Sequence, residues 1–388
     1  MSTIGGQEGR HPELRKSLRD LLEQFDDAYH RDHAARDAYP DEWLDALTEA
    51  GWLAAMIPEE WGGAGLGLEE ASVIMEEINR SGANAGHCHG QMYNMATLLH
   101  HGSDEQKRHW LPQIAAGLRL QSMAVTEPTT GSDTTRTKTV ARKVGERWEL
   151  SGQKVWTSRV RQSDLMVLLA RTTPVDECAR KSDGMSLFLV DLREALDNGL
   201  EARPIDNMVG HHTNELFLDG LTVGEDSLIG EEGRGFRYVL SGLNAERALI
   251  AAECIGDAYW FIERSRDYAT SRTVFDRPIG RNQGIQFPLA RAYANTEAAN
   301  LMRFDACERF DRGEPCGEQA NLSKLLAADA SFEAGNAAIQ THGGFGFARE
   351  YDVERKFRET RLYQVAPIST NLILAYVAEH VLDLPRSY

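Results

Sequence analysis

A glutamate on the apolar face of a predicted helix is the residue of this chain that is best placed to move a proton. Apolar residues recur there at helical spacing, because Val239, Leu243, Ile250 and Cys254 fall on one face. Glu246 shares that face, between Leu243 and Ile250 in the stretch LSGLNAERALI. Burial of a lone carboxylate is costly unless the group is paired or functional. Glu246 is therefore a candidate general base.

A structural interpretation of Glu246 is open at this point. A slightly rotated helix would leave the carboxylate in solvent, or an arginine of a neighbouring helix would pair with it. Arg247 is a poor partner, because residues one apart on a helix do not face each other. The rest of the chain has to decide between a structural and a catalytic carboxylate.

Three zones of different periodicity surround this helix. Residues 1–120 show apolar residues at i, i+3 and i+4, which predicts an N-terminal all-α domain. Residues 121–232 carry short or alternating apolar runs bounded by Gly, Asp and Ser, which predicts a central β domain. The helical period returns over residues 233–388, as four or five long segments. The predicted fold class is α+β and multi-domain, in the order α, β, α.

The composition argues against several functional classes. The 388 residues contain no run of about 18 apolar residues, so we expect no membrane span. A net charge of −17 argues against nucleic acid or an anionic membrane as a partner. The cysteines lack CxxC spacing and the histidines lack an H-x-x-x-H pair, so no metal site is predicted. The N-terminus has no signal or transit features, and we expect a cytoplasmic protein.

One turn and four further motifs point to a cofactor. The segment Met123–Asp133, MAVTEPTTGSD, is rich in hydroxyls and backbone donors that suit a polar heterocycle or a phosphate, although alone it is only a turn. GQKVWTS, SRTVFDRPIG, NQGIQF and QTHGGFGF follow in order. Together the five motifs resemble the acyl-CoA dehydrogenase family over nearly the whole chain. The resemblance implies FAD as cofactor, a central β-barrel or sandwich domain and a C-terminal four-helix bundle.

The resemblance assigns part of the FAD site to the β domain. Val125 and Thr126 are expected at the isoalloxazine edge, and Gly131 and Ser132 near the cofactor and the CoA portion of the thioester. The ring of Trp156 would cover one face of the flavin. The hydroxyl of the neighbouring Thr157 would donate to flavin N5. The expected residues of this domain are Met123, Val125, Thr126, Gly131, Ser132, Trp156, Thr157 and Ser158. A solvated turn, and core packing of Trp156, are the structural alternatives.

The resemblance also assigns cofactor contacts to the C-terminal domain. Arg272, in an R-x-x-F match with Phe275, would bind the FAD pyrophosphate through its guanidinium fork. Gln283, Gln340, Gly343 and Gly344 would reach the FAD of a neighbouring subunit. The resemblance therefore implies an oligomer, and the usual state of the family is a homotetramer, a dimer of dimers. The expected set is Arg272, Phe275, Gln283, Gln340, Gly343, Gly344, Ile368, Ser369 and Asn371. A solvated helix end and a plain glycine turn after the helix are the alternatives for Arg272 and residues 340–346.

A departure from the commoner family pattern concerns the base. Many members carry a late glutamate in Y-x-x-Y-E-G-T, but here the stretch is YQVAPIS, with Pro367 at the glutamate position. Members of the isovaleryl- and long-chain types instead carry the base in an E-R pair that Glu246 and Arg247 match. The resemblance therefore selects Glu246 as the base, with Ser132, Asn244 and Arg247 as substrate contacts. Pro367 has no N–H to polarise the thioester, so the amide of Ile368 or an FAD ribityl hydroxyl would replace it.

These matches imply an FAD-dependent α,β-dehydrogenation of an acyl-CoA to the trans-2-enoyl-CoA. Glu246 would remove the α-proton, flavin N5 would take the β-hydride, and an electron-transfer flavoprotein would accept the electrons. A related flavoenzyme could instead use a carrier-protein thioester or act as an oxidase. A non-catalytic flavoprotein that serves as an assembly or binding partner, and an all-α binding protein without flavin, are alternatives of another class.

Overall fold

The chain folds into two compact units. The structure, a computed structural model, describes residues 4–6, 9–210 and 212–387. The first unit takes Met1–Ala38, Gly67–Ala85 and Asn244–Tyr388, and the second takes Tyr39–Leu66 and Gly86–Leu243. Each unit is described by itself below.

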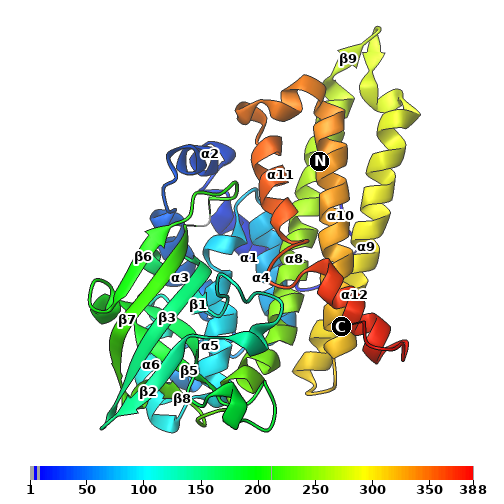
Figure 1. Ribbon diagram of the computed structural model, residues 1–388. Helices are drawn as coiled ribbons and strands as arrows, with labels where there is room; N and C mark the ends of the chain where they lie inside the picture. The colour runs from blue at the N-terminus through cyan, green and yellow to red at the C-terminus, as the bar shows by residue number, and fades with distance from the viewer. Residues whose placement is uncertain (1–3, 7–8, 211, 388) are drawn as a thin grey trace. The chain divides into compact units, whose positions relative to one another are not determined.

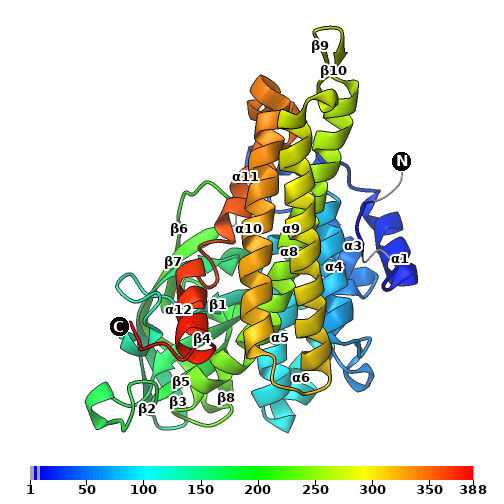
Figure 2. The same ribbon diagram turned by 90° about the vertical axis from the view of Figure 1, so that its right-hand side faces the viewer.

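The first unit is built on long helices that run side by side in both ribbon views (Figures 1 and 2). Its elements are α1 (Pro12–Leu22), α2 (Asp27–Arg36), α4 (Leu68–Arg80), α8 (Gly235–Ser271, whose first residues belong to the second unit), β9 (Thr273–Val274), β10 (Arg277–Pro278), α9 (Gln283–Asp311), α10 (Gly317–His342), α11 (Val353–Leu362) and α12 (Thr370–His380). The β9–β10 hairpin joins α8 to α9. Alanines on the inner face of α10, such as Ala327, Ala328 and Ala334, are fully buried and let α8 and α9 approach it closely.

The second unit combines helices with a β-sheet. Its elements are α3 (Asp41–Glu49), α5 (His89–His101), α6 (Asp104–Ala115), β1 (Ser122–Ala124), β2 (Val140–Val144), β3 (Arg147–Ser158), β4 (Leu165–Arg171), β5 (Met185–Asp191), α7 (Leu192–Ala195), β6 (Leu200–Pro204), β7 (Thr213–Gly224) and β8 (Leu228–Ile229). Among the described residues the strands form one eight-stranded sheet in the order β6-β7-β3-β2-β4-β5-β8, with β1 parallel to β4.

Strand β4 shows why the sequence of this sheet reads as continuous apolar runs. Met166 and Leu168 enter one hydrophobic cluster, with Trp148 and Phe188, whereas Val167 on the opposite face enters another that includes residues of α5 and α6. All seven β4 residues are buried because apolar side chains cover both faces of the strand.

The predicted fold class is confirmed. Helices precede Ser122, strands occupy Ser122–Ile229, and helices dominate the chain after Gly235. The three-domain division at residues 120 and 232 stays a prediction. No helix within the described residues has both the length and the apolar character that a membrane crossing requires.

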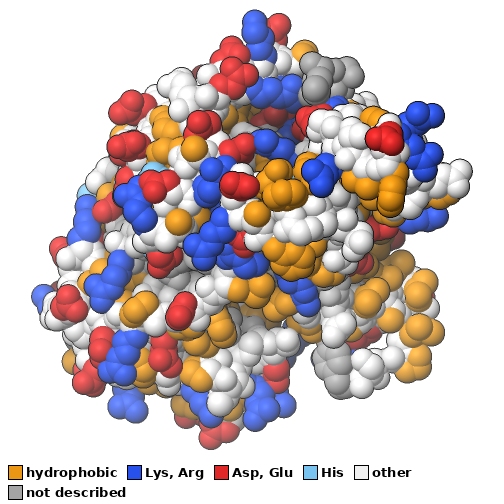
Figure 3. Space-filling view, turned by 90° about the horizontal axis from the view of Figure 1, so that it is seen from above, with side chains coloured by type: hydrophobic (Ala, Val, Ile, Leu, Met, Phe, Trp, Pro, Cys, Tyr) orange, Lys and Arg blue, Asp and Glu red, His pale blue; other side chains and the backbone are white. Residues whose placement is uncertain are grey.

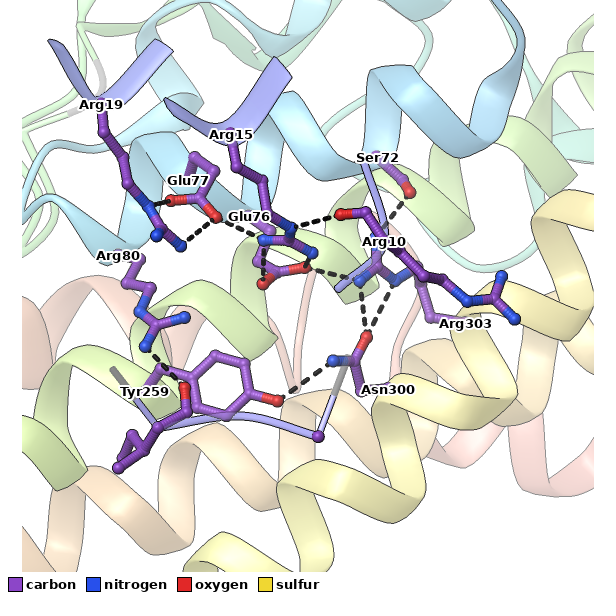
Figure 4. A network of polar contacts seen from close by, with 12 residues as sticks. Arg10, Arg15, Arg19, Ser72, Glu76, Glu77, Arg80, Tyr259, Asn300 and Arg303 are labelled. Atoms are coloured by element: carbon purple, nitrogen blue, oxygen red, sulfur yellow. Dashed lines mark hydrogen bonds and ion pairs between the residues drawn. The ribbon is translucent and has the colours of Figure 1, made fainter. Parts of the chain in front are cut away.

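Buried ion pairs tie α1 to α4 and α9 inside the first unit (Figure 4). Arg15 donates to Glu76 at 2.8 Å and also to Glu77, while Arg303 of α9 donates to Glu76 at 2.5 Å. Arg303 also donates to Ser72 and Asn300, and its side chain is fully buried. Burial alone would raise the pKa of Glu76, but Arg303 and Arg15 hold it at about 2. Glu76 is therefore ionised and fully paired.

Loss of one partner from this network should be strongly destabilising. We expect Arg303→Met to lower the stability of the first unit by about 3 to 5 kcal/mol, because Glu76 would keep a buried charge with one partner fewer. Chemical denaturation followed by far-UV circular dichroism measures the change. Arg312→Met, directly after the same helix, removes only exposed ion pairs with Glu308 and Glu314 and should leave the midpoint unchanged. Equal midpoints for the two variants would contradict the structural role of the network.

Candidate active site

Glu246 lies on the buried face of α8, as the spacing predicted. Only 7 % of its surface is exposed, and Ala245 and Ile250 nearby on the helix are also buried. Its carboxylate has no hydrogen bond or ion pair within the described residues of its unit, and Arg247 donates instead to Asn244 Oδ1 at 3.0 Å. Burial raises the pKa of Glu246 to about 7, which Arg247 and Lys324 partly counteract. A carboxyl with that pKa can accept a proton at neutral pH.

Glu246 differs from the other buried carboxylates that the structure describes in this unit. Each of the others has at least one polar partner. Tyr363 donates to Glu253 at 2.9 Å, and Lys356 contacts Asp257 at 2.6 Å. The full set of partnered carboxylates is Glu76, Glu77, Glu253, Asp257, Asp352 and Glu359. The alternative of a structural arginine partner for Glu246 therefore finds no support within this unit.

The predicted substrate contacts on α8 lie beside the N-terminus of α10 and the helix α12. Asn244 and Arg247 are partly exposed, and burial lowers the pKa of Arg247, which Glu246 and Tyr376 partly restore. A side chain at Gly317 would come within 3.2 Å of the Tyr376 hydroxyl. Residues of α10 and α12 thus lie close to the two predicted substrate contacts on α8.

Lys324 of α10 is a neighbour that the sequence interpretation missed. Its side chain is fully buried, and its ammonium donates to the carbonyls of Tyr363 and Ile368. The segment between those carbonyls contains Pro367, at the position of the commoner family glutamate. The signal was present, because Lys324 shares a helix face with Ala320, Ala327 and Ala328, the pattern that singled out Glu246.

In the second unit, a buried ion pair holds the turn after β1. Lys154 of β3 donates to the carbonyl of Val125 at 3.0 Å and to Glu127 at 3.1 Å. Burial alone would raise the pKa of Glu127, but Lys154 and the hydroxyl and amide of Thr139 hold it below its usual value. Val155 N also donates to Thr126 O at 2.9 Å. The turn and the end of β3 are therefore fixed to each other, a pairing that the sequence interpretation did not foresee.

The predicted flavin contacts at the end of β3 differ in how far their side chains are exposed. Trp156 is 60 % exposed and has a positive φ of 61°, so it is not a core residue. Thr157 is 1 % exposed, and its buried Oγ1 has no hydrogen-bond partner in the structure. Ser158 is half-buried, whereas Gly131 and Ser132 lie exposed in the turn. The structure brings together Met123, Val125, Thr126, Trp156, Thr157 and Ser158 where β1, its turn and β3 meet.

The predicted residues of the first unit divide into two groups. One group lies at the hairpin end of the helices, where Arg272 follows α8 and stacks 5.9 Å from the Phe345 ring. Phe275 in the hairpin is 93 % exposed, and a Cβ at Gly343 or Gly344 would meet no atom within 4 Å. Gln283 begins α9 and Gln340 lies near the end of α10, both exposed at this end. Figure 3 looks onto it and shows hydrophobic side chains among Lys and Arg side chains.

The second group lies elsewhere in the first unit. Ile368, Ser369 and Asn371 stand at the N-terminus of α12, beside the lower half of α10 in Figure 2 and away from the hairpin. Ser369 caps α12 by accepting from Leu372 N. The structure therefore does not gather all predicted cofactor contacts of this unit at one place.

Comparison with known proteins identifies the family. Three family models match the chain in order: the acyl-CoA dehydrogenase N-terminal domain over residues 9–118, the middle domain over 122–221 and the C-terminal domain over 233–382. The chain belongs to the acyl-CoA dehydrogenase family. Its members are FAD-dependent flavoproteins, and the chain is an oxidoreductase that acts on acyl-CoA.

Individual relatives match at full length. The acyl-CoA dehydrogenase FadE12 of Mycobacterium tuberculosis (strain ATCC 25618 / H37Rv) is 34% identical over 97% of this chain and 96% of its own length. An acyl-CoA dehydrogenase of Bacillus subtilis (strain 168) is 33% identical over 85% of this chain and 86% of its own. The structure of a glutaryl-coenzyme A dehydrogenase in complex with glutaryl-CoA superposes with a TM-score of 0.90, at 27% identity, over 100% of this chain and 98% of that one.

The residues of this acyl-CoA dehydrogenase fit FAD. The buried hydroxyl of Thr157 lacks a partner, which a flavin heteroatom would supply. The exposed ring of Trp156 is available for stacking, and the open space at Gly131, Gly343 and Gly344 allows a cofactor to approach the backbone. Arg272 is exposed at a helix end, as a pyrophosphate ligand must be.

Replacement of Thr157 separates flavin binding from folding. Thr157→Val keeps the side-chain shape and removes a hydroxyl without a partner, so the flavin-free protein should melt at the same temperature or higher. The FAD dissociation constant should rise about five- to tenfold, as expected for loss of one hydrogen bond. Thr139→Val is the control, because its hydroxyl donates to Glu127 and its loss should lower the melting temperature. Unchanged FAD affinity in Thr157→Val would contradict the assignment.

Proposed function

We propose that this chain oxidises an acyl-CoA thioester to the trans-2-enoyl-CoA and that Glu246 removes the α-proton. The observation that carries the proposal is the buried carboxylate of Glu246, the one buried carboxylate described in its unit that lacks a polar partner there. A group of this kind is poised for proton transfer rather than for stability. Anaerobic bleaching of the flavin by a panel of acyl-CoAs tests the activity and ranks the acyl groups.

The proton chemistry follows from the pKa of Glu246. A base with a pKa near 7 is substantially ionised at neutral pH and still basic enough to share an α-proton in the transition state. FAD, when bound, accepts the hydride from the β-carbon. Glu246 holds the α-proton at its carboxylate until the enoyl product leaves. Asn244 and Arg247 are proposed to bind the thioester, and Ser132 stays a predicted substrate contact.

The backbone of residue 367 cannot polarise the thioester carbonyl, so another hydrogen-bond donor must do so. Pro367 has no N–H. The next amide, that of Ile368, donates to no protein group within the described residues, so it is free to serve a ligand. The carbonyl of Ile368 is fixed by Lys324 at 2.6 Å, which restrains the plane of the neighbouring peptide. We assign the donor role to Ile368 N.

Assembly and electron transfer complete the proposal. The exposed aromatic side chains Phe275, Phe287 and Phe347 at the hairpin end suit a second copy of the chain, in line with a homotetramer whose subunits share FAD sites. An electron-transfer flavoprotein is the proposed acceptor and the cytoplasm the proposed location. Peroxide formation in air would instead favour an oxidase, and flavin bleaching only by an acylated carrier protein would favour a carrier-bound substrate.

Replacement of Glu246 should separate binding from chemistry. Glu246→Gln is nearly isosteric, so the variant should stay yellow and bind acyl-CoA, yet flavin reduction should slow by at least about 10²- to 10⁴-fold. Stopped-flow absorbance after mixing with the best substrate measures the rate. Asp257→Asn is the matched control, because burial also raises the pKa of Asp257 to about 7 on the same helix, yet Lys356 pairs with it. Reduction near the wild-type rate in Glu246→Gln would assign the base to another residue.

The rate of flavin reduction should depend on pH with the sign of a general base. Glu246 must be deprotonated to act, so the rate should rise with pH, level off above about pH 7, and fall about tenfold for each pH unit below it. Single-turnover rates from pH 5 to pH 9 provide the profile. A rate that rises toward acidic pH would be incompatible with Glu246 as the base.

A further inference from the structure

Lys324 occupies an unusual position for a lysine. It is fully buried in the first half of α10, and its ammonium donates to two backbone carbonyls, Tyr363 O and, at 2.6 Å, Ile368 O. Both acceptors are neutral, and no carboxylate within the described residues forms an ion pair with Lys324. An isolated buried ammonium is costly, so a purely structural role would be served as well by a neutral donor.

Lys324 fixes both ends of one loop. The Tyr363–Ile368 segment joins α11 to α12, and its first residue is also anchored through the Tyr363 hydroxyl, which donates to Glu253 at 2.9 Å. Gln364 accepts from Thr370 at 3.0 Å across the loop. With its two end carbonyls bound to one ammonium, the loop presents the Ile368 amide in a fixed orientation.

The charge of Lys324 also acts on Glu246. The charged groups that face Glu246 are Arg247 and Glu253 on α8 and Lys324 on α10, and Lys324 is the one from another element. Around Lys324 stand Cys254, Glu246 and Arg247 of α8 and Asp329 of α10. Tyr376 of α12 and Cys316 act on Arg247. The positive charges of Arg247 and Lys324 oppose the desolvation of the Glu246 carboxylate, whereas the negative charge of Glu253 adds to it.

We propose that Lys324 is a positioning residue for this reaction: its ammonium, bound to the carbonyls of Tyr363 and Ile368, orients the Tyr363–Ile368 loop and supplies a positive charge to the surroundings of Glu246. The inference rests on the proposed role of Glu246 as the base. Burial lowers the pKa of Lys324 to about 8, so the ammonium is mostly protonated at the pH where Glu246 has to be ionised. Loss of its charge leaves Arg247 alone to oppose desolvation.

The pH profile of three variants tests this role. In Lys324→Gln, which keeps an N–H donor and loses the charge, the acidic limb of flavin reduction should move up by about one pH unit. The rate should then fall about tenfold below wild type at pH 6 and converge with it at pH 9, where wild-type Lys324 is also largely neutral. Lys324→Arg keeps the charge and should retain the wild-type limb. Lys356→Met removes another fully buried lysine, one paired with Asp257, and should not move the limb.

A second readout needs no turnover. The carboxyl stretching band of Glu246, identified by its loss in Glu246→Gln, can be titrated by infrared difference spectroscopy on the substrate-free holoprotein. In Lys324→Gln the midpoint of this titration should rise by about one pH unit, as the acidic limb of flavin reduction does. If no acyl-CoA bleaches wild-type flavin, the proposed function fails, whereas the infrared titration still decides the effect of Lys324.

Three results would overturn the proposal. The first is an unmoved limb and infrared midpoint in Lys324→Gln, with activity lost evenly at all pH values. The second is an equal shift in Lys356→Met, which would indicate a general effect of buried charge. The third is failure of Lys324→Gln and Lys324→Met to fold while Lys324→Arg folds, which would leave Lys324 a purely structural residue.

Discussion

A carboxylate held away from water without a polar partner is the constraint on which the first unit depends. Helix α8 places Glu246, Glu253 and Asp257 on its buried side, and the last two each have a polar partner, Tyr363 for Glu253 and Lys356 for Asp257. The difference between them lies in what the surrounding helices supply. Around Glu246 the structure offers charge at a distance, from Lys324 and Arg247, and no direct contact. That arrangement raises the pKa of Glu246 to about 7, so the carboxyl can both release and accept a proton near neutral pH. A structural ion pair has the opposite effect, because the arginines around Glu76 hold its pKa at about 2.

In the second unit, a buried ion pair holds the turn after β1 and leaves polar groups of the turn available to a ligand. Its turn after β1 is proposed to offer backbone groups to FAD, and in that role its own polar atoms cannot all be used in bonds within the turn. The buried pair of Glu127 and Lys154 holds the turn from beneath and leaves Gly131 and Ser132 exposed. The hydroxyl of Thr157, buried and without a partner, is the complementary feature, because it is satisfied only when a ligand is present. A turn fixed by the Glu127–Lys154 pair, together with the unsatisfied hydroxyl of Thr157, is the kind of arrangement that preorganises a cofactor site.

The sequence predicted the order of helical and β regions because periods of 3.6 and 2 follow from local geometry and were uninterrupted here. It predicted the burial of Glu246 for the same reason. It did not predict the two lysines that support the site. Lys324 donates to carbonyls about forty residues further along the chain, and Lys154 pairs with Glu127 in the turn after β1. Such contacts are set by tertiary packing, although the face that each lysine occupies, beside Ala327 or Leu150, could have been recognised from spacing. The separation of Ile368 from Arg272 likewise depends on chain path rather than on local pattern.

The most direct test of the central claim isolates proton removal from oxidation. An acyl-CoA whose β-carbon is quaternary has no β-hydrogen to lose, so only its α-hydrogens can react. Incubated with the holoenzyme in deuterium oxide and followed by mass spectrometry, such a compound should gain deuterium at the α-carbon with wild type and not with Glu246→Gln. Exchange that persists at the wild-type rate in Glu246→Gln would show that another group removes the proton and would contradict the account.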